Sequence, residues 1–568
     1  MAGEPPIYGE LRPSQIITTY GPGSIVDFPS DSAIIKLINE HTWLDPTPIF
    51  HARLQAKLGV DEFRVPGTGR FAVPATQFPK YHVCSGCGAI RSDFVLSEKA
   101  KPMCTCRGHV APARFVIGCK EGHIDDFPWT FWAHLKKGMC ENPKLRERID
   151  NTKAGLEGYW VHCETCGAQN NLGDIFNRTI FNRYIKKCRG TKPWVSPSAR
   201  DNCNEAPVVM QRGASNVYFP SIESSLYIPE DSNELNEKLG KYMITLKTID
   251  NPEIMKTVLS GIHKTDPNLN KFPLEQILSF IDDSLWPAKT LTSDDLRCSE
   301  WEAFTETKTP YYDQDFSIRD EDVPHDYSKL IDRVILCERL REIRILKGFR
   351  RVEPYDPEQE KPNSLKLVAP YSCEWLPACE IKGEGIFIKL NETEVSKWEE
   401  KTEVKERYAI LIGAYNSWRA NQGQGRSKHG PRFYLIHTLA HLFIKQLSLE
   451  CGYSSASIRE RIYADGKMVG FLIYTGSPDS DGSLGGLVEM GTKKNMYSLL
   501  ENTIKSAETC SMDPVCSEIT PTSETLLNAA SCHACVLVSE TSCEFSNRLL
   551  DRALIKGLPN SPRTGYFK

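Results

Sequence analysis

The strongest constraint on this chain lies near its C-terminus, where five cysteines fall within 34 residues. Two of them form the motif Cys532-His-Ala-Cys535, and the others are Cys510, Cys516 and Cys543. Thiolates separated by two residues can bind one tetrahedral ion from a tight turn, and flanking segments supply the remaining two ligands. We predict a structural zinc site formed by Cys516, Cys532, Cys535 and Cys543, with Cys510 as the alternative ligand. Four cysteines can also hold an iron–sulfur cluster, but zinc is favoured because no other electron-transfer motif is present.

Ten further cysteines lie between residues 81 and 215. They begin with the pairs Cys84-Ser-Gly-Cys87 and Cys104-Thr-Cys106, which are separated by 16 residues. Two close pairs at this separation are typical of a zinc ribbon, in which each pair occupies a hairpin turn. The glycines inside and after the first pair allow backbone N–H groups to turn toward the sulfur atoms. These four cysteines are predicted to bind zinc, with His109 as an alternative ligand.

A second set in the same block starts with Cys163-Glu-Thr-Cys166 and continues with Cys188 and Cys203 at wider intervals. We predict that these four cysteines bind another zinc ion, so that the chain holds two to three zinc ions. Five of the remaining cysteines are interpreted as buried thiols. They are Cys298, Cys337, Cys373, Cys379 and Cys451.

The 20 cysteines also bear on the compartment. The N-terminus, Met1-Ala-Gly-Glu-Pro-Pro, lacks the basic and apolar regions of a secretory signal. Cysteines without such a signal favour metal ligation in a reducing cytoplasm over disulfide bonds. The most apolar stretch, Phe433 to Leu447, contains 15 residues with two His and one Lys, so no membrane span is expected. The net charge of −4 argues against nucleic-acid binding over the whole protein surface. A local basic face can still bind nucleic acid.

A length of 568 residues, with 40% apolar and 25% charged side chains, predicts a multi-domain α+β protein with well-formed cores. Four segments are expected along the chain. They are residues 1–80, with loops and short strands; 81–215, a block of zinc-ribbon-like modules; 216–430, a mixed α/β region; and 431–568, a helical zinc-binding domain.

Apolar periodicity predicts several elements within these segments. Pro431 opens a helix to about Glu450 that is apolar on nearly every face and is therefore expected to be buried. Apolar residues at helical spacing predict another helix over Tyr327–Leu346, which ends at Gly348. The other expected elements are helices at Glu234–Leu246, Pro273–Ser284 and Thr492–Glu508, a strand at Met468–Thr475, and a loop at Gly482–Gly486.

The helix predicted over Tyr327–Leu346 and the residues after it carry a stripe of basic side chains. This basic stripe comprises Arg339, Arg341, Arg344, Lys347, Arg350 and Arg351. Such a stripe is a candidate phosphate contact. It is also compatible with a solvated helix face, because Glu338, Glu342 and Glu353 dilute its charge.

Two other groups of polar residues have the composition of a catalytic or metal-binding site. Cys119, His123, Asp125 and Asp126 lie close together in sequence and are able to hold a metal or act as acid and base. The alternative interpretation is a turn whose aspartates cap a helix near Pro128.

His437-Thr-Leu-Ala-His441 places two imidazoles one helical turn apart, as in a zincin, but Thr438 replaces the general-base glutamate. Hydrogen-bonded core histidines are therefore favoured at these positions. The turn Tyr20-Gly-Pro-Gly23 is interpreted as structural, with a phosphate-binding loop as the weaker alternative.

Several catalytic signatures are missing from the sequence. It contains no G-x-x-x-x-G-K-[ST] loop for ATP, no G-x-S-x-G nucleophile elbow and no H-x-K-x-x-x-x-D nuclease pair. If the chain takes part in an ATP-driven process, another subunit must supply the ATPase.

Seven motifs, in this order, resemble one family over nearly the whole chain. They are Arg12–Gly23, Gly122–Trp129, Arg212–Pro220, Gly383–Phe387, His437–His441, Tyr474–Thr475 with Gly482–Gly486, and Cys532–Cys535. The chain resembles the DrmB family, the helicase-associated subunits of the bacterial DISARM anti-phage system. Its C-terminal part is similar to the zinc-binding domain of MrfA-type repair helicases.

The resemblance implies a non-catalytic subunit that binds zinc and pairs with a DrmA-like helicase, so that the complex engages DNA in phage defence. Two alternatives are a metal-dependent nuclease using His123, Asp125, Asp126 and Glu384, and a stand-alone zinc protein that binds DNA. Cleavage of DNA with Mg²⁺ or Mn²⁺ would identify the first, and DNA binding without a partner would identify the second.

Overall fold

The computed structural model of the chain describes most of the sequence. The described residues are 7–29, 31–38, 43–60, 62–96, 102–228, 238, 239, 242, 246, 249, 251–285, 292–313, 315–354, 356, 358, 366, 367, 375–476, 486–521, 527–559 and 561–567. Cys373, most of the helix expected at Glu234–Leu246 and most of the loop expected at Gly482–Gly486 lie outside these residues.

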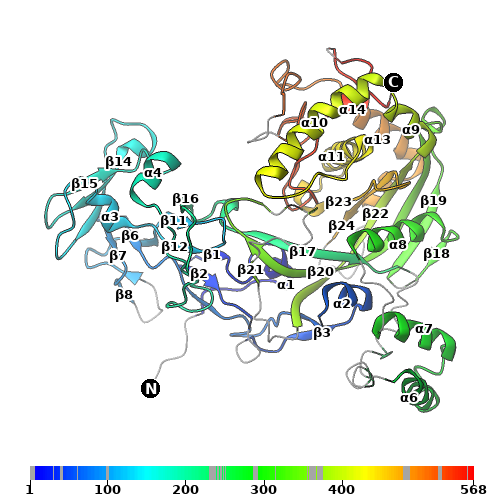
Figure 1. Cartoon of the computed structure of the whole chain (residues 1–568), viewed down its shortest axis with the longest axis horizontal. Helices are drawn as coiled ribbons and strands as arrows, with labels where there is room; N and C mark the ends of the chain where they lie inside the picture. Colours follow the sequence, from blue (N-terminus) through cyan, green and yellow to red (C-terminus); the bar gives the residue numbers. More distant parts are fainter. Residues whose placement is uncertain are drawn as a thin grey trace.

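A ten-stranded sheet forms the centre of the molecule (Figure 1). Its main path runs β18 (Tyr311–Tyr312), β19 (Phe316–Glu321), β20 (Ile331–Arg350), β22 (Trp375–Leu390), β24 (Gly470–Thr475) and β23 (Ile458–Tyr463). Four shorter strands extend it, namely β3 (Thr47–Ile49), β4 (Glu62–Val65), β17 (Phe219–Leu226) and β21 (Lys366–Leu367). Strand β20 pairs with β19 through its first half and with β17 through its second half, so it organises the sheet.

The helix predicted over Tyr327–Leu346 is wrong, because this segment forms most of β20. Leu336 packs against the helices on one face of the sheet, while Ile335 and Cys337 pack on the opposite face. Since both faces are covered, apolar residues occur in adjacent positions rather than in simple alternation. A register shift between Cys337 and Leu340 further disrupts the alternation. The resulting spacing imitates a helical period.

Helices cover one face of this sheet (Figure 1). This helical layer comprises α9 (Glu392–Glu399), α10 (Thr402–Asn421), α11 (Pro431–Cys451), α12 (Gly486–Met490), α13 (Lys493–Ser506) and α14 (Ala553–Lys556). The predictions of helices at Pro431 and Thr492 and of a strand before Thr475 are confirmed. Helix α11 begins at proline and ends at Gly452, whose φ of 71° is left-handed. No helix in the described part of the chain is long and apolar enough to cross a membrane.

Helix α8 (Ser293–Thr305) packs on the opposite face of the sheet, where Phe304 stacks on Phe387 with ring centroids 4.7 Å apart. Helices α6 (Pro252–Thr265) and α7 (Leu274–Leu285) form a separate hairpin, and α7 confirms the helix expected at Pro273–Ser284. The N-terminal segment adds a three-stranded sheet and two short helices. They are β1 (Ile25–Asp27), β2 (Ser32–Ile35), β5 (Ala75–Gln77), α1 (Pro13–Thr18) and α2 (Ala52–Leu58).

Residues 82–211 form a distinct cysteine-rich lobe, drawn in cyan at the left of Figure 1. It contains a six-stranded, a three-stranded and a two-stranded sheet, with the aromatic side chains of Phe127, Trp132 and Phe181 in its core. Its elements are short. They are β6 (His82–Cys84), β7 (Ala89–Arg91), β8 (Val95–Leu96), β9 (Pro102–Met103), β10 (Val110–Pro112), β11 (Phe115–Gly118), β12 (Ile124–Asp126), α3 (Trp129–Ala133), β13 (Leu145–Ile149), β14 (Tyr159–Cys163), β15 (Gln169–Asn171), α4 (Arg178–Tyr184) and β16 (Val208–Gln211).

Arg351 joins the N-terminal segment, the cysteine-rich lobe and the central sheet. Its guanidinium donates to the backbone oxygens of Gly122 (2.8 Å), Val217 (2.5 Å) and Gly23 (2.6 Å). The side chain is fully buried. Gly23 adopts a φ of 87°, and a Cβ there would lie 2.4 Å from the ring of Phe349. The turn at Tyr20–Gly23 is therefore structural.

Candidate metal centres

Five clusters of side chains have the composition and spacing of metal sites, and in each the four ligand atoms lie within 4.8 Å of one another. Sulfur atoms around a tetrahedral zinc ion are about 3.7 Å apart, because each Zn–S bond is about 2.3 Å long. A disulfide would instead hold two sulfur atoms about 2.05 Å apart. The sulfur–sulfur distances in the four cysteine-dominated clusters range from 3.4 to 3.9 Å. These clusters therefore fit zinc rather than disulfides.

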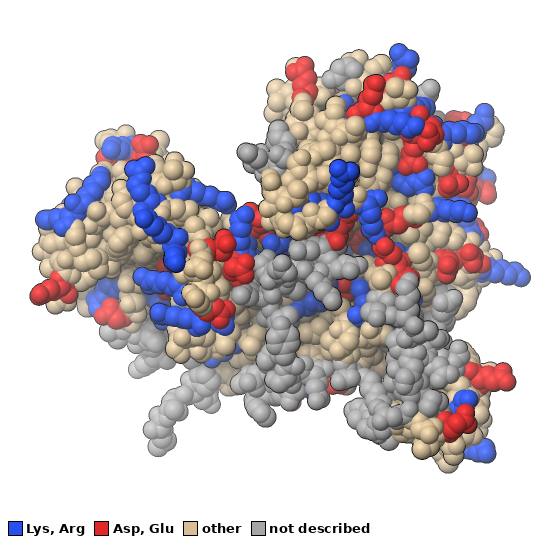
Figure 2. Space-filling model, viewed as in Figure 1, with Lys and Arg blue, Asp and Glu red and all other residues tan. Residues whose placement is uncertain are grey.

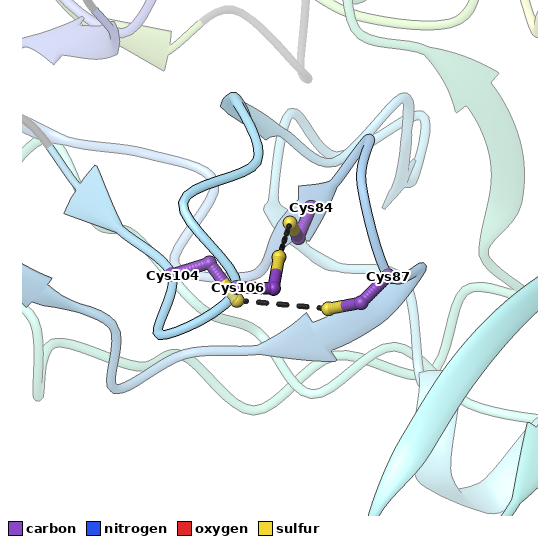
Figure 3. A group of neighbouring side chains, drawn as sticks. All are labelled: Cys84, Cys87, Cys104 and Cys106. Atoms are coloured by element: carbon purple, nitrogen blue, oxygen red, sulfur yellow. Dashed lines mark hydrogen bonds between the residues drawn. The ribbon is translucent and has the colours of Figure 1, made fainter.

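The first cluster contains Cys84, Cys87, Cys104 and Cys106, as the sequence predicted (Figure 3). Cys84 ends β6, Cys87 lies in the turn before β7, and the other two come from the loop between β9 and β10. The Sγ atoms of Cys84 and Cys106 are 3.4 Å apart, and those of Cys87 and Cys104 are 3.6 Å apart. His109 joins none of the clusters among the described residues.

Glycines make room for this cluster. A Cβ on Gly108 would lie 2.8 Å from the Sγ of Cys84, so only glycine fits there without displacement. The backbone N–H of Gly108 also donates to the Sγ of Cys106 (3.3 Å). The backbone N–H of Cys106, with help from neighbouring thiols, lowers the pKa of Cys104 to about 6. The thiolate, which is the form that binds metal, is therefore favoured at Cys104. At Cys106 the backbone N–H of Gly108 lowers the pKa, but side-chain hydrogen bonds to Cys84 and Cys104 outweigh it and raise the pKa of Cys106 to about 12.

The second cluster contains Cys119, His123, Cys188 and Cys203. Cys119 and His123 flank the turn between β11 and β12, and their Sγ and Nδ1 atoms are 3.4 Å apart. The other imidazole nitrogen of His123 contacts a carboxylate oxygen of Asp201 at 3.1 Å. A carboxylate at this position orients a metal-binding histidine and fixes its tautomer.

The third cluster contains His134, Cys140, Cys163 and Cys166. His134 ends α3, and its Nε2 lies 3.4 Å from the Sγ of Cys140 and 3.3 Å from that of Cys166. Its Nδ1 contacts the backbone oxygen of Thr130 at 2.6 Å, which orients the ring toward the sulfurs.

The structure therefore divides the set that the sequence predicted as one site. Cys163 and Cys166 lie with His134 and Cys140, because β13 and β14 pair and bring the ends of this hairpin beside α3. Cys188 and Cys203 belong to a segment that returns to β12, where the backbone N–H of Ile124 donates to Thr191 (3.3 Å).

The fourth cluster contains Cys510, Cys516, Cys532 and Cys535. The Sγ distances are 3.5 Å between Cys510 and Cys532, 3.6 Å between Cys516 and Cys535, and 3.7 Å within the Cys532–Cys535 turn. The structure thus places Cys510 where Cys543 was predicted. Cys543 contacts His437 instead, in a fifth cluster that also contains His441 and Glu460.

Arg552 fixes the segment that carries Cys510 of the fourth cluster. It is fully buried, donates to the backbone oxygen of Ala507 (3.0 Å) and forms an ion pair with Asp513. Asp513 in turn accepts the backbone N–H of Cys510 at 2.9 Å. Arg552, which lies beyond the last of these cysteines in sequence, is therefore part of the scaffold of the fourth cluster.

The residues proposed for a nuclease do not form one site. His123 belongs to the second cluster, and Asp126 accepts the backbone N–H groups of Lys80 (2.9 Å) and Tyr81 (3.2 Å). Burial raises the pKa of Asp126 to about 6. Glu384 lies on β22 and accepts the backbone N–H of Leu487 (3.0 Å). Among the described residues, Asp125, Asp126 and Glu384 join none of the five clusters.

The basic stripe is not an available phosphate-binding face. Arg344 is 3% exposed and bonds Glu342 through its Nε (2.8 Å), while Arg341 pairs with Asp315 (3.0 Å) and Glu380. The remaining members differ in their surroundings: Arg350 and Arg351 are buried, Lys347 pairs with Glu223 at 2.9 Å, and Arg339 is exposed.

Sequence reasoning left out His134 and Cys140, and it named Cys510 only as an alternative ligand. It grouped Cys119 and His123 with Asp125 and Asp126, whereas the structure places them with Cys188 and Cys203. The Cys-x-x-x-His spacing at Cys119 was a usable signal, since the two residues flank a hairpin turn. His134 gave no such signal, because it is six residues from Cys140 and joins Cys163 and Cys166 only through the fold. Among the thiols interpreted as buried, Cys337 and Cys379 are buried, Cys451 is half-buried and Cys298 is exposed.

Comparisons with known proteins place these clusters in context. A family described as the MrfA Zn-binding domain matches residues 439–536, which include all four cysteines of the fourth cluster. A domain family of unknown function matches residues 12–219, which include the first three clusters.

A protein of Bacillus paralicheniformis described as DISARM protein DrmB is 37% identical over 566 residues, covering 96% of this chain and all of the relative. A crystal structure of the DUF1998 helicase MrfA bound to DNA covers 43% of this chain and 25% of the helicase chain, at 11% identity. Its TM-score is 0.16, which is too low to indicate a shared fold.

Proposed function

Since this chain belongs to the family of the DISARM protein DrmB, we propose that it is a non-catalytic subunit that binds a DrmA-like DNA helicase. In this role it helps the helicase engage DNA during defence against phage. The observation that carries the proposal is the 37% identity across the entire length of the relative. The absence of an ATP-binding loop from the sequence supports the assignment of the motor to another subunit.

The proposal includes zinc as a structural cofactor and the cytoplasm as the location. Zn²⁺ would be held by thiolates and imidazoles of the first four clusters, whose donor sets and spacing fit a closed tetrahedral site. Such sites leave no position open for substrate, which agrees with a scaffolding role. A reducing compartment keeps these thiols available for metal.

The cysteine-rich lobe is our candidate for the DNA contact. Residues 82–211 contain 19 Lys and Arg against 13 Asp and Glu, a net charge of +6, whereas the whole chain carries −4. Zinc bound to three thiolate-rich clusters would lower this value to about +2, so the lobe would stay basic. Figure 2 shows Lys and Arg side chains spread over the visible face of this lobe, at the left.

Helix α4 and its flanks combine basic and aromatic side chains on this surface. Arg178, Arg183 and Lys186 are exposed. Phe176 and Tyr184 are 43% and 45% exposed, which is unusual for large aromatic rings. Basic side chains neutralise phosphates and aromatic rings stack on bases, so this combination fits single-stranded DNA.

Co-expression with the helicase subunit tests the proposal. We expect a stable complex in which ATP hydrolysis requires the helicase, while the chain alone hydrolyses no ATP and cleaves no DNA with Mg²⁺ or Mn²⁺. Failure to co-purify, or DNA cleavage that survives removal of contaminating nuclease, would contradict the subunit assignment.

Charge reversal tests the DNA surface. Changing Arg178, Arg183 and Lys186 to Glu should weaken DNA binding by the complex roughly tenfold or more and reduce its salt dependence. The matched control changes Lys329, Lys494 and Lys505 to Glu, because these lysines are exposed and lie outside the cysteine-rich lobe. Equal losses in both triple variants would show a general charge effect and exclude α4 as the contact.

A further inference from the structure

The fifth cluster lies between three elements of the C-terminal half. His437 and His441 extend from successive turns of α11, Glu460 lies on β23, and Cys543 belongs to the C-terminal segment that follows the fourth cluster. The Nε2 of His437 is 3.0 Å from a carboxylate oxygen of Glu460 and 3.3 Å from the Sγ of Cys543. The Nε2 of His441 is 3.4 Å from the other oxygen of Glu460.

These distances match the edges of a coordination tetrahedron. Zn–N bonds of about 2.0–2.1 Å and a Zn–S bond of about 2.3 Å separate neighbouring ligand atoms by about 3.3–3.6 Å. The three contacts that converge on Glu460 and His437 fall close to this range, and all four ligand atoms lie within 4.8 Å.

The surroundings orient each side chain toward a common centre. The Nδ1 of His441 contacts the backbone oxygen of Val536 at 3.2 Å, which leaves Nε2 free to act as a ligand. The Sγ of Cys543 accepts the backbone N–H groups of Phe545 (3.3 Å) and Asn547 (3.2 Å), as a thiolate would. Glu460 accepts the backbone N–H of Glu544 at 3.1 Å.

Because the fifth cluster is buried, its ionisable side chains carry a desolvation penalty that a bound cation offsets. His437, His441 and Glu460 are fully buried, and within the described structure the Nε2 of His441 and the Oε2 of Glu460 lie 3.4 Å apart without a hydrogen bond to each other or to another group. Buried ionisable groups require compensation by a charge or a metal. Two neutral imidazoles, one carboxylate and one thiolate carry a total charge of −2, which a divalent cation neutralises.

We propose that His437, His441, Glu460 and Cys543 bind a divalent transition-metal ion, with zinc as the preferred ion. Imidazole, carboxylate and thiolate ligands in a tetrahedral arrangement suit Zn²⁺. The ion ties the C-terminal segment to α11 and β23. Glu460 and Cys543 also line a cavity of about 1430 Å³, which gives the ion a route to and from solvent.

Metal counting on the full chain, purified under reducing conditions, tests this site. Native mass spectrometry should show one ion fewer in Cys543→Ser and in His441→Gln than in the wild-type chain, with the other ions retained. Cys298→Ser is the matched control, because Cys298 is exposed and belongs to none of the clusters among the described residues. Unchanged ion counts in both folded variants would overturn the proposal.

A second measurement serves if the variants do not fold. Anomalous diffraction from the wild-type chain at the zinc edge should give a peak about 2.0–2.3 Å from the four ligand atoms. A wild-type structure with the first four sites filled and no peak at the fifth would refute the site. Replacement by Co²⁺ adds a check, since Cys543→Ser should remove the charge-transfer band of only one thiolate.

Discussion

Arg351 shows how one side chain joins segments that are remote in sequence. Its guanidinium donates to three backbone oxygens and faces Trp194 and Phe349 at 5.2 and 4.8 Å from their ring centroids. Burial lowers the pKa of Arg351 to about 9. Backbone dipoles and aromatic faces therefore compensate the charge where a carboxylate would be expected.

Replacing Arg351 should destabilise the protein strongly. Arg351→Ala leaves three buried carbonyl groups without their donor and should lower the free energy of unfolding by about 3 kcal/mol or more. Arg351→Lys should rescue little, because one ammonium group cannot reproduce the planar fork. Urea denaturation measures both effects, with Arg339→Ala as the exposed control. A loss below about 1 kcal/mol for Arg351→Ala would contradict this role.

Glu342 makes the free energy of unfolding depend on pH. Burial alone would raise its pKa, but the guanidinium groups of Arg344 and Arg461 outweigh burial and lower the pKa to about 2. The carboxylate therefore stabilises the fold above its unfolded pKa of 4.5, and this contribution is lost as pH falls toward 2. The full contribution is about 3 kcal/mol.

The pH dependence can be isolated with Glu342→Gln, which removes the titrating group. Between pH 5 and pH 3 the wild-type chain should lose more stability in urea than the variant loses. Other carboxylates and the metal sites respond to acid in both proteins, so the difference in slope belongs to Glu342. Parallel curves would show that Glu342 does not titrate with a lowered pKa.

At the scale of elements, the finding that β20 is a buried strand and not a helix changes what its arginines are expected to do. Because Arg344 is buried beside Glu342 and Arg350 is 8% exposed, reversing Arg341, Arg344 and Arg350 to Glu should reduce the yield of folded protein. Thermal unfolding should show this loss before any DNA is added. Arg339→Glu should be nearly neutral. A folded triple variant with weakened DNA binding would restore β20 as a DNA contact.

The sequence was sufficient for elements whose signals are local. Helix α11 has a proline at its start, a glycine after its end and apolar residues throughout, so it was predictable. The first cluster was predictable because each pair of cysteines occupies its own turn. Strand β20 was not, since burial on both faces and register shifts produced an apparent helical period. Cluster partners such as His134 and Cys163 meet only because the β13–β14 hairpin packs beside α3.

At the scale of the whole molecule, the interactions that stabilise the C-terminal half differ from those that stabilise the cysteine-rich lobe. The C-terminal half has an extensive apolar cluster between α11 and the central sheet. The cysteine-rich lobe has a smaller core between strands of two to five residues, and it contains three of the clusters. A structural zinc ion contributes ~10 kcal/mol or more where a site forms only on folding. The lobe should therefore depend on metal more than the C-terminal half does.

Loss of a single ion from the fourth cluster should act locally. Cys535→Ser should remove one zinc ion and reduce amide protection between Cys510 and Val538, while α11 stays protected by its apolar contacts. Hydrogen exchange measured by mass spectrometry resolves these segments. Cys298→Ser, as the control, should change neither metal content nor exchange. Unaltered protection around Cys510 in Cys535→Ser would argue against a structural ion there.

Complete metal removal should unfold the cysteine-rich lobe while the central sheet stays folded. A strong zinc chelator under reducing conditions should abolish amide protection in residues 82–211, because three clusters lose their ions and the small core cannot hold the short strands together. Strands β20 and β22 should keep their protection, since their contacts with α11 and α8 need no metal. DNA binding by the complex should fall with the lobe, and restored zinc should recover both. Simultaneous loss of protection in the lobe and in β20 would instead show that the metal sites stabilise the chain as one cooperative unit.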